Sequence, residues 1–393
     1  MPGSVIVAGA RTPIGKLSGG LASFTAMALG GLAIKAALER AGVSPDQVQY
    51  VFMGQVLQAG QGQITARQAA AKAGIPLNVP ATTVNKVCLS GLNSIYLADL
   101  MIQAGEADIV VAGGMESMTQ APYLVPGARA GLRIGDGKIV DSMMYDGLTC
   151  AFDNCAMGVA TEKYAAGTLS REAQDEFAAK SHERAAAAAK DGKLGDEIVP
   201  VSIPQRKGDP ILFDTDEGVR PGTTSESLGG LRPAFDPKGT ITAGNASQIS
   251  DGAAAVIVVS KAFAEKLGVD PLGEVVSYGQ VAGPDTTSLL TQPSRATNVA
   301  LEKVGKSATD VDLFELNEAF AAVGLASMAD LGITDEVANV NGGAIALGHP
   351  VGASGTRIAL SLLLELRRRG GGLGAAALCG GGGQGDALLV KTL

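Results

Sequence analysis

The chain has 393 residues and a formal net charge of −8, with 46% hydrophobic and 18% charged residues. Its length predicts two or three domains, and its acidic balance, without a basic stripe, argues against nucleic-acid binding. The longest apolar run, residues 252–259, is too short to span a bilayer, and no signal-peptide pattern opens the sequence. We therefore expect a soluble, cytoplasmic protein.

The first part of the chain alternates short apolar runs with longer helical patterns. Strands are predicted over 4–10, 48–56, 81–87 and 108–114, and helices over 25–42, 64–74 and 92–105. Such alternation is typical of an α/β fold with a largely parallel sheet covered by helices.

The central part, residues 120–247, has a different character. It is rich in loops, and it carries one charged helix over 170–192 that begins at a Ser170 cap. Long insertions of this kind usually cover a substrate.

The last part of the chain returns to the first pattern. Strands are predicted over 273–283, 311–317, 336–343 and 372–381, and helices over 295–305, 318–332 and 355–370. The order V-N, S-G, long helix, apolar strand and G-G recurs in both parts. Any α/β protein shows some echoes, but this shared detail favours a duplicated domain. We expect one half over 1–119, completed by 248–270, an inserted loop domain over 120–247, and a second half over 271–393.

The four cysteines show no CxxC spacing, and the chain has only two histidines, so a metal site is not expected. Reduced thiols in a reducing compartment fit better. Cys88, in "NKVCLSG", stands where a predicted strand passes into a helix. The amides of a helix N-terminus favour a thiolate and lower its pKa. A buried, inert thiol is the commoner fate of a single cysteine, and both interpretations stay open on this residue alone.

Other polar residues stand in the Gly-rich loops of the last part. His349 lies in "GHP" and is a candidate base, whereas His182 is expected to be a solvated residue of the charged helix. Cys379 ends an apolar strand and opens a four-glycine run, whose backbone amides could approach an oxyanion. Asn317 could act in catalysis or cap a helix.

Three segments resemble the thiolase family in combination, and within it the short-chain acetyl-CoA acetyltransferase branch. They are "NEAFA" (317–321), "GGAIALGHPVGASGTR" (342–357) and "CGGGGQG" (379–385), and the resemblance extends over essentially the whole chain. It implies the thiolase fold: two duplicated βαβαβαββ domains in an αβαβα layered arrangement, with an inserted loop domain. It also implies reversible condensation of two acetyl-CoA molecules to acetoacetyl-CoA and CoA. Coenzyme A thioesters are then substrates, no cofactor is needed, and the assembly is a homotetramer.

The resemblance also implies roles for individual residues. Cys88 is the acylated nucleophile, and His349 activates it and, with a water held by Asn317, binds the thioester oxygen of the second acetyl-CoA. Cys379 transfers the α-proton. The amides of Cys88 and Gly381 hold the oxyanion of the acyl-enzyme. Contacts to CoA and its pantetheine arm fall to Arg220, Ser247, Leu148, Met157 and Phe320, and further cations that could meet the nucleotide are Arg206, Lys207 and Arg232.

Two departures leave the acyl-chain preference open. Ala156 stands where many short-chain members have a histidine, and the segment 279–288 lacks their methionine-glycine pair. The alternative is therefore a broader-chain 3-ketoacyl-CoA thiolase of fatty-acid degradation.

Rival functions fit less well. A β-ketoacyl synthase needs a second catalytic histidine, or an asparagine, and no second cysteine. A non-catalytic acyl-CoA-binding relative would be expected to lose one of Cys88, His349 or Cys379, and a nicotinamide dehydrogenase needs a glycine fingerprint that is missing.

Overall fold

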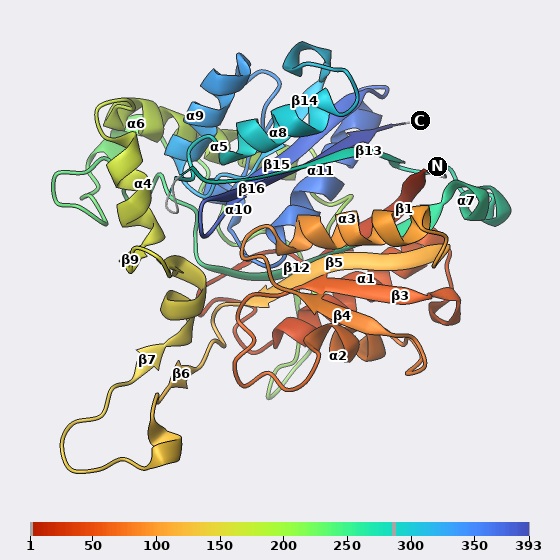
Figure 1. Ribbon diagram of the computed structural model, residues 1–393, viewed down its shortest axis with the longest axis horizontal. Coiled ribbons are helices and arrows are strands. Elements are labelled where there is room, and N and C mark those ends of the chain that lie inside the picture. The colour runs from red at the N-terminus through yellow and green to blue at the C-terminus, as the bar shows by residue number, and fades with distance from the viewer. Residues whose placement is uncertain (1–2, 285–287, 393) are drawn as a thin grey trace.

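A computed structural model describes residues 3–284 and 288–392 (Figure 1). Within this part, the principal strands form one ten-stranded sheet in the order β14-β15-β16-β13-β1-β12-β5-β3-β4, and β2 pairs with β12. The two halves of the sheet join between β1 and β13 over only two residue pairs. The strands are β1 (Ser4–Arg11), β2 (Gly15–Lys16), β3 (Tyr50–Gly54), β4 (Ala81–Val84), β5 (Ile109–Ser117), β12 (Ser250–Ser260), β13 (Gly273–Ala282), β14 (Leu313–Leu316), β15 (Leu373–Gly380) and β16 (Gln384–Lys391).

Both halves of the sheet have the same strand order. In the first half, β1, β3, β4, β5 and β12, numbered one to five along the chain, are arranged 3-2-4-5-1. In the second half, Ala338 takes the place of the third strand through a parallel bridge to Phe314 of β14. The order is then Ala338, β14, β15, β16 and β13, which is again 3-2-4-5-1. In each half the second and fourth strands are parallel, and the fifth is antiparallel to the fourth. This arrangement confirms the predicted duplication. The prediction of a largely parallel sheet is wrong: among the described strands only β3–β4, β3–β5 and β14–β15 pair in parallel, because the first and fifth strands of each half run against their neighbours.

The strand predicted over 336–343 is wrong, because it is reduced to that single bridge. Asn339 adopts a positive φ of 48°. Its side chain accepts a hydrogen bond from the Leu316 amide and donates one to the Leu316 carbonyl, both at 2.8 Å. An amide side chain thus makes the bonds that a continuing strand would make.

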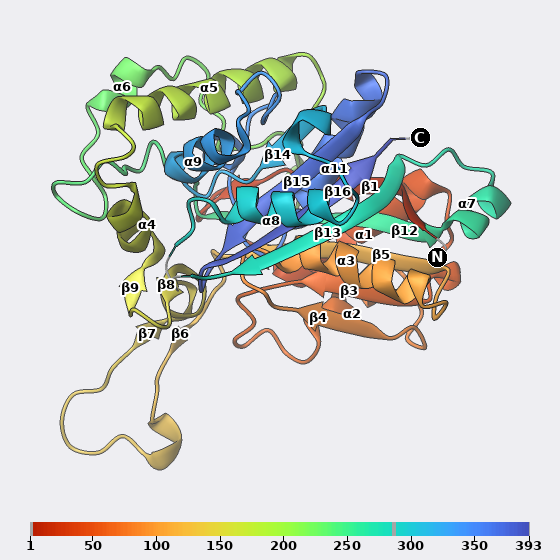
Figure 2. The same ribbon diagram turned by 45° about the horizontal axis from the view of Figure 1, so that its top comes forward.

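Helices separate and cover the two halves (Figures 1 and 2). α1 (Ala26–Ala41) and α2 (Thr65–Lys72) cover the outer face of the first half, and α8 (Gln292–Glu302) and α9 (Ala321–Leu331) that of the second. Between them, α3 (Ser90–Gln103) and α11 (Ser354–Arg368) share one core with strands of both halves. The layers are therefore α, β, α, β, α, as the resemblance implies.

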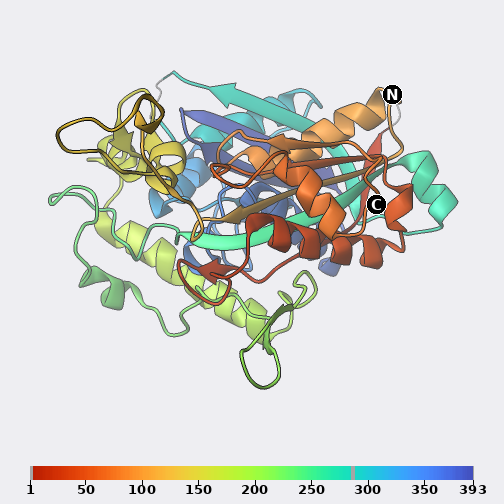
Figure 3. The same ribbon diagram turned by 90° about the horizontal axis from the view of Figure 1, so that it is seen from below.

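The inserted segment lies beside these layers, with its longest helix along one side of them (Figure 3). As predicted, the Ser170 hydroxyl caps that helix by accepting a hydrogen bond from the Ala173 amide. The segment's elements are β6 (Tyr123–Leu124), β7 (Val140–Asp141), a π-helix (Met143–Leu148), β8 (Thr149–Cys150), β9 (Cys155–Ala156), α4 (Met157–Ala165), α5 (Arg171–Lys190), β10 (Val201–Ile203), β11 (Ile211–Phe213) and α6 (Ser225–Gly229).

The remaining helices are short. They are α7 (Lys261–Leu267), α10 (Ala344–Leu347) and 3-10 turns at Pro45–Gln47, Ala128–Ala130 and Ala308–Asp310. Among the described residues, none of the helices combines the length and apolar character needed to cross a membrane.

Candidate active site

Cys88 lies in a tight turn between β4 and α3, as predicted, although the strand ends at Val84 rather than at 87. Val87 adopts φ 50°, a conformation that a β-branched residue rarely takes and that the surrounding structure has to hold. The Ser90 hydroxyl does part of this, since it accepts from the Lys86 amide at 2.8 Å and donates to the Val87 carbonyl at 2.6 Å. The turn presents Cys88 directly before the N-cap of α3, Leu89.

The thiol of Cys88 is harder to ionise than the sequence predicts. Burial raises its pKa to about 12, against the opposing effect of hydrogen bonds from the amides of Cys88 and Gly381, and nearby Glu116 raises it further. The expected lowering by the helix N-terminus is therefore wrong, because desolvation of the thiolate outweighs the amides. Cys88 is a neutral thiol near pH 7 and needs a base. The same two amides point at Cys88, where an acyl oxygen would gather negative charge.

Cys379 approaches Cys88 from the other half of the fold. It occupies the penultimate position of β15, is buried, and pairs with Gly385 of β16. Burial raises the pKa of Cys379, and the charge that Cys88 would carry as a thiolate raises it further. The glycine run permits this approach, since a Cβ on Gly380 would lie 2.7 Å from the Leu89 side chain.

His349 is held so that one ring nitrogen faces the site. Nδ1 lies 2.6 Å from the Ser354 hydroxyl, which donates to the Pro350 carbonyl at 3.1 Å. The hydroxyl therefore accepts from Nδ1–H, and Nε2 keeps its lone pair. Burial lowers the pKa of His349 to about 3, and the charge of Arg357 adds to this. His349 is a neutral imidazole, as a general base must be.

Asn317 lies beside His349. Its side-chain nitrogen is 3.5 Å from His349 Nε2, and its buried Oδ1 has no hydrogen-bond partner among the described residues. Helix capping does not explain this residue, because α9 begins at Ala321 with Phe320 as its N-cap.

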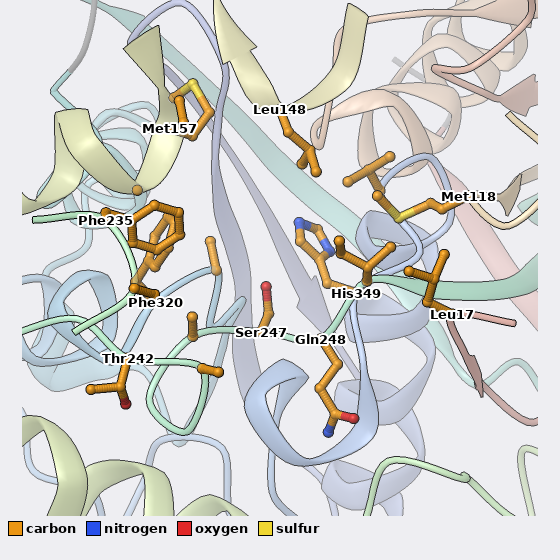
Figure 4. A pocket seen from close by; sticks show the side chains of 18 of the residues that line it. Leu17, Met118, Leu148, Met157, Phe235, Thr242, Ser247, Gln248, Phe320 and His349 are labelled. Atoms are coloured by element: carbon orange, nitrogen blue, oxygen red, sulfur yellow. The ribbon is translucent and has the colours of Figure 1, made fainter. Parts of the chain in front are cut away.

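Two adjoining cavities connect these groups to the surface. The inner cavity, about 70 Å³, is lined by both cysteines, His349 and Gly381. The outer one, about 470 Å³, continues from it, and Leu148, Met157, Ser247, Phe320 and His349 line both. In Figure 4, His349 points between Leu148 and Ser247, with Phe235 and Phe320 on one side and Leu17 and Met118 on the other. The shape is a channel that ends at two thiols.

The outer cavity brings in residues that the sequence analysis missed. Phe235 packs edge to face on Phe320, with ring centroids 6.1 Å apart, and Leu17, Met118 and Gln248 complete the wall. None of them has a local sequence signal. Of the proposed cations, Arg220 lines this cavity, whereas Arg206, Lys207 and Arg232 are exposed and do not. Ala156 also lines it, with a methyl group that cannot replace a histidine's hydrogen bonds.

The prediction for His182 is wrong. Its ring is buried at 2% exposure, and Nδ1 accepts a hydrogen bond from the Arg220 amide at 3.2 Å. Burial, with a smaller effect of Arg220, lowers its pKa to about 4. His182 supports the loop that brings Arg220 to the outer cavity.

Comparison with known proteins agrees with this geometry. Residues 4–262 match the family model "Thiolase, N-terminal domain" and residues 269–392 match "Thiolase, C-terminal domain". A probable acetyl-CoA acetyltransferase of Mycolicibacterium smegmatis is 58% identical over 98% of this chain and 100% of its own length. The acetyl-CoA acetyltransferase of Cupriavidus necator is 54% identical over 98% of both chains. The crystal structure of the Bacillus anthracis acetyl-CoA acetyltransferase superposes with a TM-score of 0.97, at 40% identity, over 100% of this chain and 99% of that one. The chain belongs to the thiolase family.

Proposed function

We propose that this protein is an acetyl-CoA C-acetyltransferase, which condenses two acetyl-CoA molecules to acetoacetyl-CoA and CoA and also catalyses the reverse thiolysis. The observation that carries the proposal is the inner cavity, where a thiol from each half of the fold meets a neutral imidazole and a backbone amide aimed at Cys88. One thiol can hold an acyl group while the other moves a proton.

In the first half-reaction, Cys88 attacks the thioester carbonyl of acetyl-CoA. His349 Nε2 takes the thiol proton as the sulfur–carbon bond forms, and the proton then passes to the departing CoA thiolate. The amides of Cys88 and Gly381 stabilise the oxyanion of the tetrahedral intermediate. The product is an acetyl-Cys88 thioester and free CoA.

In the second half-reaction, a new acetyl-CoA enters the channel. The Cys379 thiol first passes its own proton to His349 Nε2, and the Cys379 thiolate then removes a proton from the methyl group of acetyl-CoA. The protonated Nε2 of His349 and the Asn317 amide donate hydrogen bonds to the enolate oxygen. The enolate carbon attacks the acetyl carbonyl, and Cys88 leaves as a thiolate that takes the proton held by His349, which restores the neutral imidazole. Acetoacetyl-CoA departs, so kinetics are ping-pong. CoA thioesters serve as substrates, and the scheme uses no cofactor.

The dimensions of the inner cavity favour a short acyl group over the broader-chain alternative. At about 70 Å³ it is small, and large apolar side chains, among them Leu289, line it. Part of the segment 279–288, named above for chain-length preference, lies outside the described residues.

Recognition of the CoA moiety is assigned to the outer cavity. Leu148, Met157 and Phe320 offer apolar surface to the pantetheine arm, Ser247 offers a hydroxyl, and Arg220 a cation for the nucleotide phosphates.

We propose a homotetramer in the cytoplasm, where thiols stay reduced. The arm around β6 and β7 stands away from the body (Figure 1) and exposes several large apolar side chains, as expected of a surface that another subunit covers. They are Tyr123, Val125, Leu132, Ile134 and Ile139.

The test is to trap the first intermediate. The protein is mixed with radiolabelled acetyl-CoA, quenched in acid and digested, and the label is expected on the peptide containing Cys88, at one acetyl group per chain. Cys88→Ala is the control and should carry no label. Wild-type protein that stays unlabelled, or label that persists on Cys88→Ala, would contradict the proposed mechanism.

A further inference from the structure

Lys86 forms an ion pair that joins the two halves of the fold beside the site. Its ammonium lies 2.7 and 2.9 Å from the two carboxylate oxygens of Asp386, although the residues are 300 positions apart in the chain. Lys86 stands two residues before Cys88, in the strained turn. Asp386 of β16 pairs with Leu378 of β15, and Leu378 is the residue directly before Cys379. The bond therefore connects the two segments that carry the cysteines.

The carboxylate of Asp386 is itself fixed by its surroundings. It is fully buried, and the Tyr278 hydroxyl donates a hydrogen bond to it at 2.6 Å. Tyr278 in turn stacks on Tyr96 of α3, with ring centroids 4.2 Å apart and the planes 6° from parallel. Asn93 of α3 also hydrogen-bonds to Tyr278. The turn that carries Cys88 therefore contacts Asp386 of β16, and the following helix, α3, contacts Tyr278 of β13. Asp386 and Tyr278 are hydrogen-bonded to each other.

The turn needs such a connection. The Ser90 hydroxyl fixes the internal shape of residues 86–90, but it sets no distance between this turn and the other half of the fold. The acyl oxyanion needs the amide of Cys88 from one half and that of Gly381 from the other, at a spacing that contacts between the halves must hold. The Thr356 hydroxyl donates to the Gly91 carbonyl of α3 at 2.9 Å, but Lys86 makes its bond from within the turn itself. Across that boundary Val87 and Leu89 make apolar contacts with the glycine loop, which are not directional.

We propose that Lys86 and Asp386 are positioning residues, which hold the Cys88 turn at the correct distance from Gly381 and Cys379. The inference rests on the proposed nucleophilic role of Cys88. Lys86 does not act through its charge, because that charge is neutralised by Asp386. Its effect is geometric, and a displacement of the turn of about 1 Å is expected to slow acylation by about ten- to a hundredfold.

The experiment compares Lys86→Met and Lys86→Arg with wild type in two assays. One follows acetylation of Cys88 by acetyl-CoA in single turnover, and the other follows alkylation of Cys88 by iodoacetamide as a function of pH. Lys86→Met is expected to acetylate about ten- to a hundredfold more slowly, with KM for acetyl-CoA within about twofold of wild type, and Lys86→Arg to recover most of the rate. The midpoint of the alkylation profile should stay where it is in wild type.

A matched control separates positioning from simple destabilisation. Arg171 and Asp175 form an ion pair of 2.6 Å whose side chains are 19% and 2% exposed, against 21% and 0% for Lys86 and Asp386. Arg171→Met should lower thermal stability about as much as Lys86→Met, yet leave the acetylation rate of Cys88 near wild type.

Three outcomes would overturn the proposal. In the first, Lys86→Met acetylates at the wild-type rate. In the second, Lys86→Met and Arg171→Met slow acetylation equally. In the third, Lys86→Met moves the pH midpoint of alkylation without changing its limiting rate, which would mean that the charge of Lys86 acts on Cys88. If Lys86→Met does not fold, the pair Lys86→Gln with Asp386→Asn keeps a hydrogen bond without buried charge and is judged by the same assays. Failure of the proposed function is distinguishable, because wild type itself would then take no acetyl group while alkylation of Cys88 could still be measured.

Discussion

A single methyl group added at Gly114 is expected to displace the loop that carries His349. Gly114 lies in β5, where that strand passes directly under the loop that begins at His349. A Cβ on Gly114 would lie 1.9 Å from the Gly352 carbonyl oxygen and 2.8 Å from the Ala353 Cα. Both atoms belong to the backbone, so no side-chain rotation can relieve the contact.

The magnitude follows from this distance. Real Cβ contacts are essentially never under 3.0 Å, so the loop or the strand has to move by about 1 Å. The loop is held on its other side, since the Gly352 amide donates to buried Glu116 at 3.0 Å. Overpacking of a well-packed region costs about 1–3 kcal/mol, and a shift of about 1 Å in a catalytic group costs about 10²-fold in rate. Gly114→Ala should therefore lose activity far more than stability.

The assays are thiolysis of acetoacetyl-CoA and unfolding in guanidinium chloride. Gly229→Ala is the control, because a Cβ at Gly229 in α6 meets nothing within 4 Å, and it should match wild type in both assays. If Gly114→Ala keeps wild-type activity, then the position of the His349 loop does not set the rate, and the argument from close packing is wrong.

Three further predictions concern the thiols and the histidines. In Cys379→Ser, acetylation of Cys88 should stay close to the wild-type rate, whereas carbon–carbon bond formation should fall by about 10²-fold or more. The two rates are measured as the acyl-enzyme burst and as turnover of acetoacetyl-CoA. Loss of both would mean that the cysteines do not divide the two half-reactions between them. His349→Ala should slow synthesis and thiolysis by about 10²-fold with little change in KM. His182→Ala should instead raise KM for acetyl-CoA and leave kcat near wild type. Equal losses of kcat in the two variants would refute this assignment of roles. Because burial lowers the pKa of His182 to about 4, the unfolded state binds more protons than the folded state between about pH 6.5 and 4. The free energy of unfolding of wild type should therefore fall relative to His182→Gln as the pH is lowered through that window, as denaturation at a series of pH values can check; a constant difference would mean that His182 is not buried in its neutral form.

Hydrophobic periodicity predicted most of the strands and helices, because alternating strands and amphipathic helices leave a strong local pattern, whereas the layered arrangement came from the family resemblance. The duplicated order is visible in the sequence for the same reason, since both halves place V-N, S-G and G-G at equivalent strand and helix ends. The prediction of a strand over 336–343 failed for a reason that the hydrophobic pattern does not contain. The positive φ of Asn339, and its two side-chain bonds to Leu316, depend on a neighbour 23 positions away.

The candidate site was predictable where its chemistry lies in short motifs. His349 and Cys379 stand next to glycine-rich segments, and Cys88 stands just before a Ser-Gly pair where a predicted strand passes into a helix. The burial of His182 was not predictable, because a stretch such as "SHERAAAAA" is typical of an exposed helix, and what buries it includes a loop 38 residues later. Lys86 and Asp386 are separated by 300 positions, and neither carries a motif.

The order of the two half-reactions follows from the electrostatics of the paired thiols. A thiolate at Cys88 would raise the pKa of Cys379, so the two cannot both ionise readily in one apolar cavity. Acetylation turns Cys88 into an uncharged thioester and removes that repulsion, so that Cys379 can take part in proton transfer without a charged neighbour. Once the carbon–carbon bond forms, Cys88 leaves as a thiolate, and the repulsion returns while Cys379 holds the proton it has gained. Each thiol is therefore charged only while the other is neutral, and proton abstraction from the second acetyl-CoA is favoured only after Cys88 has been acetylated.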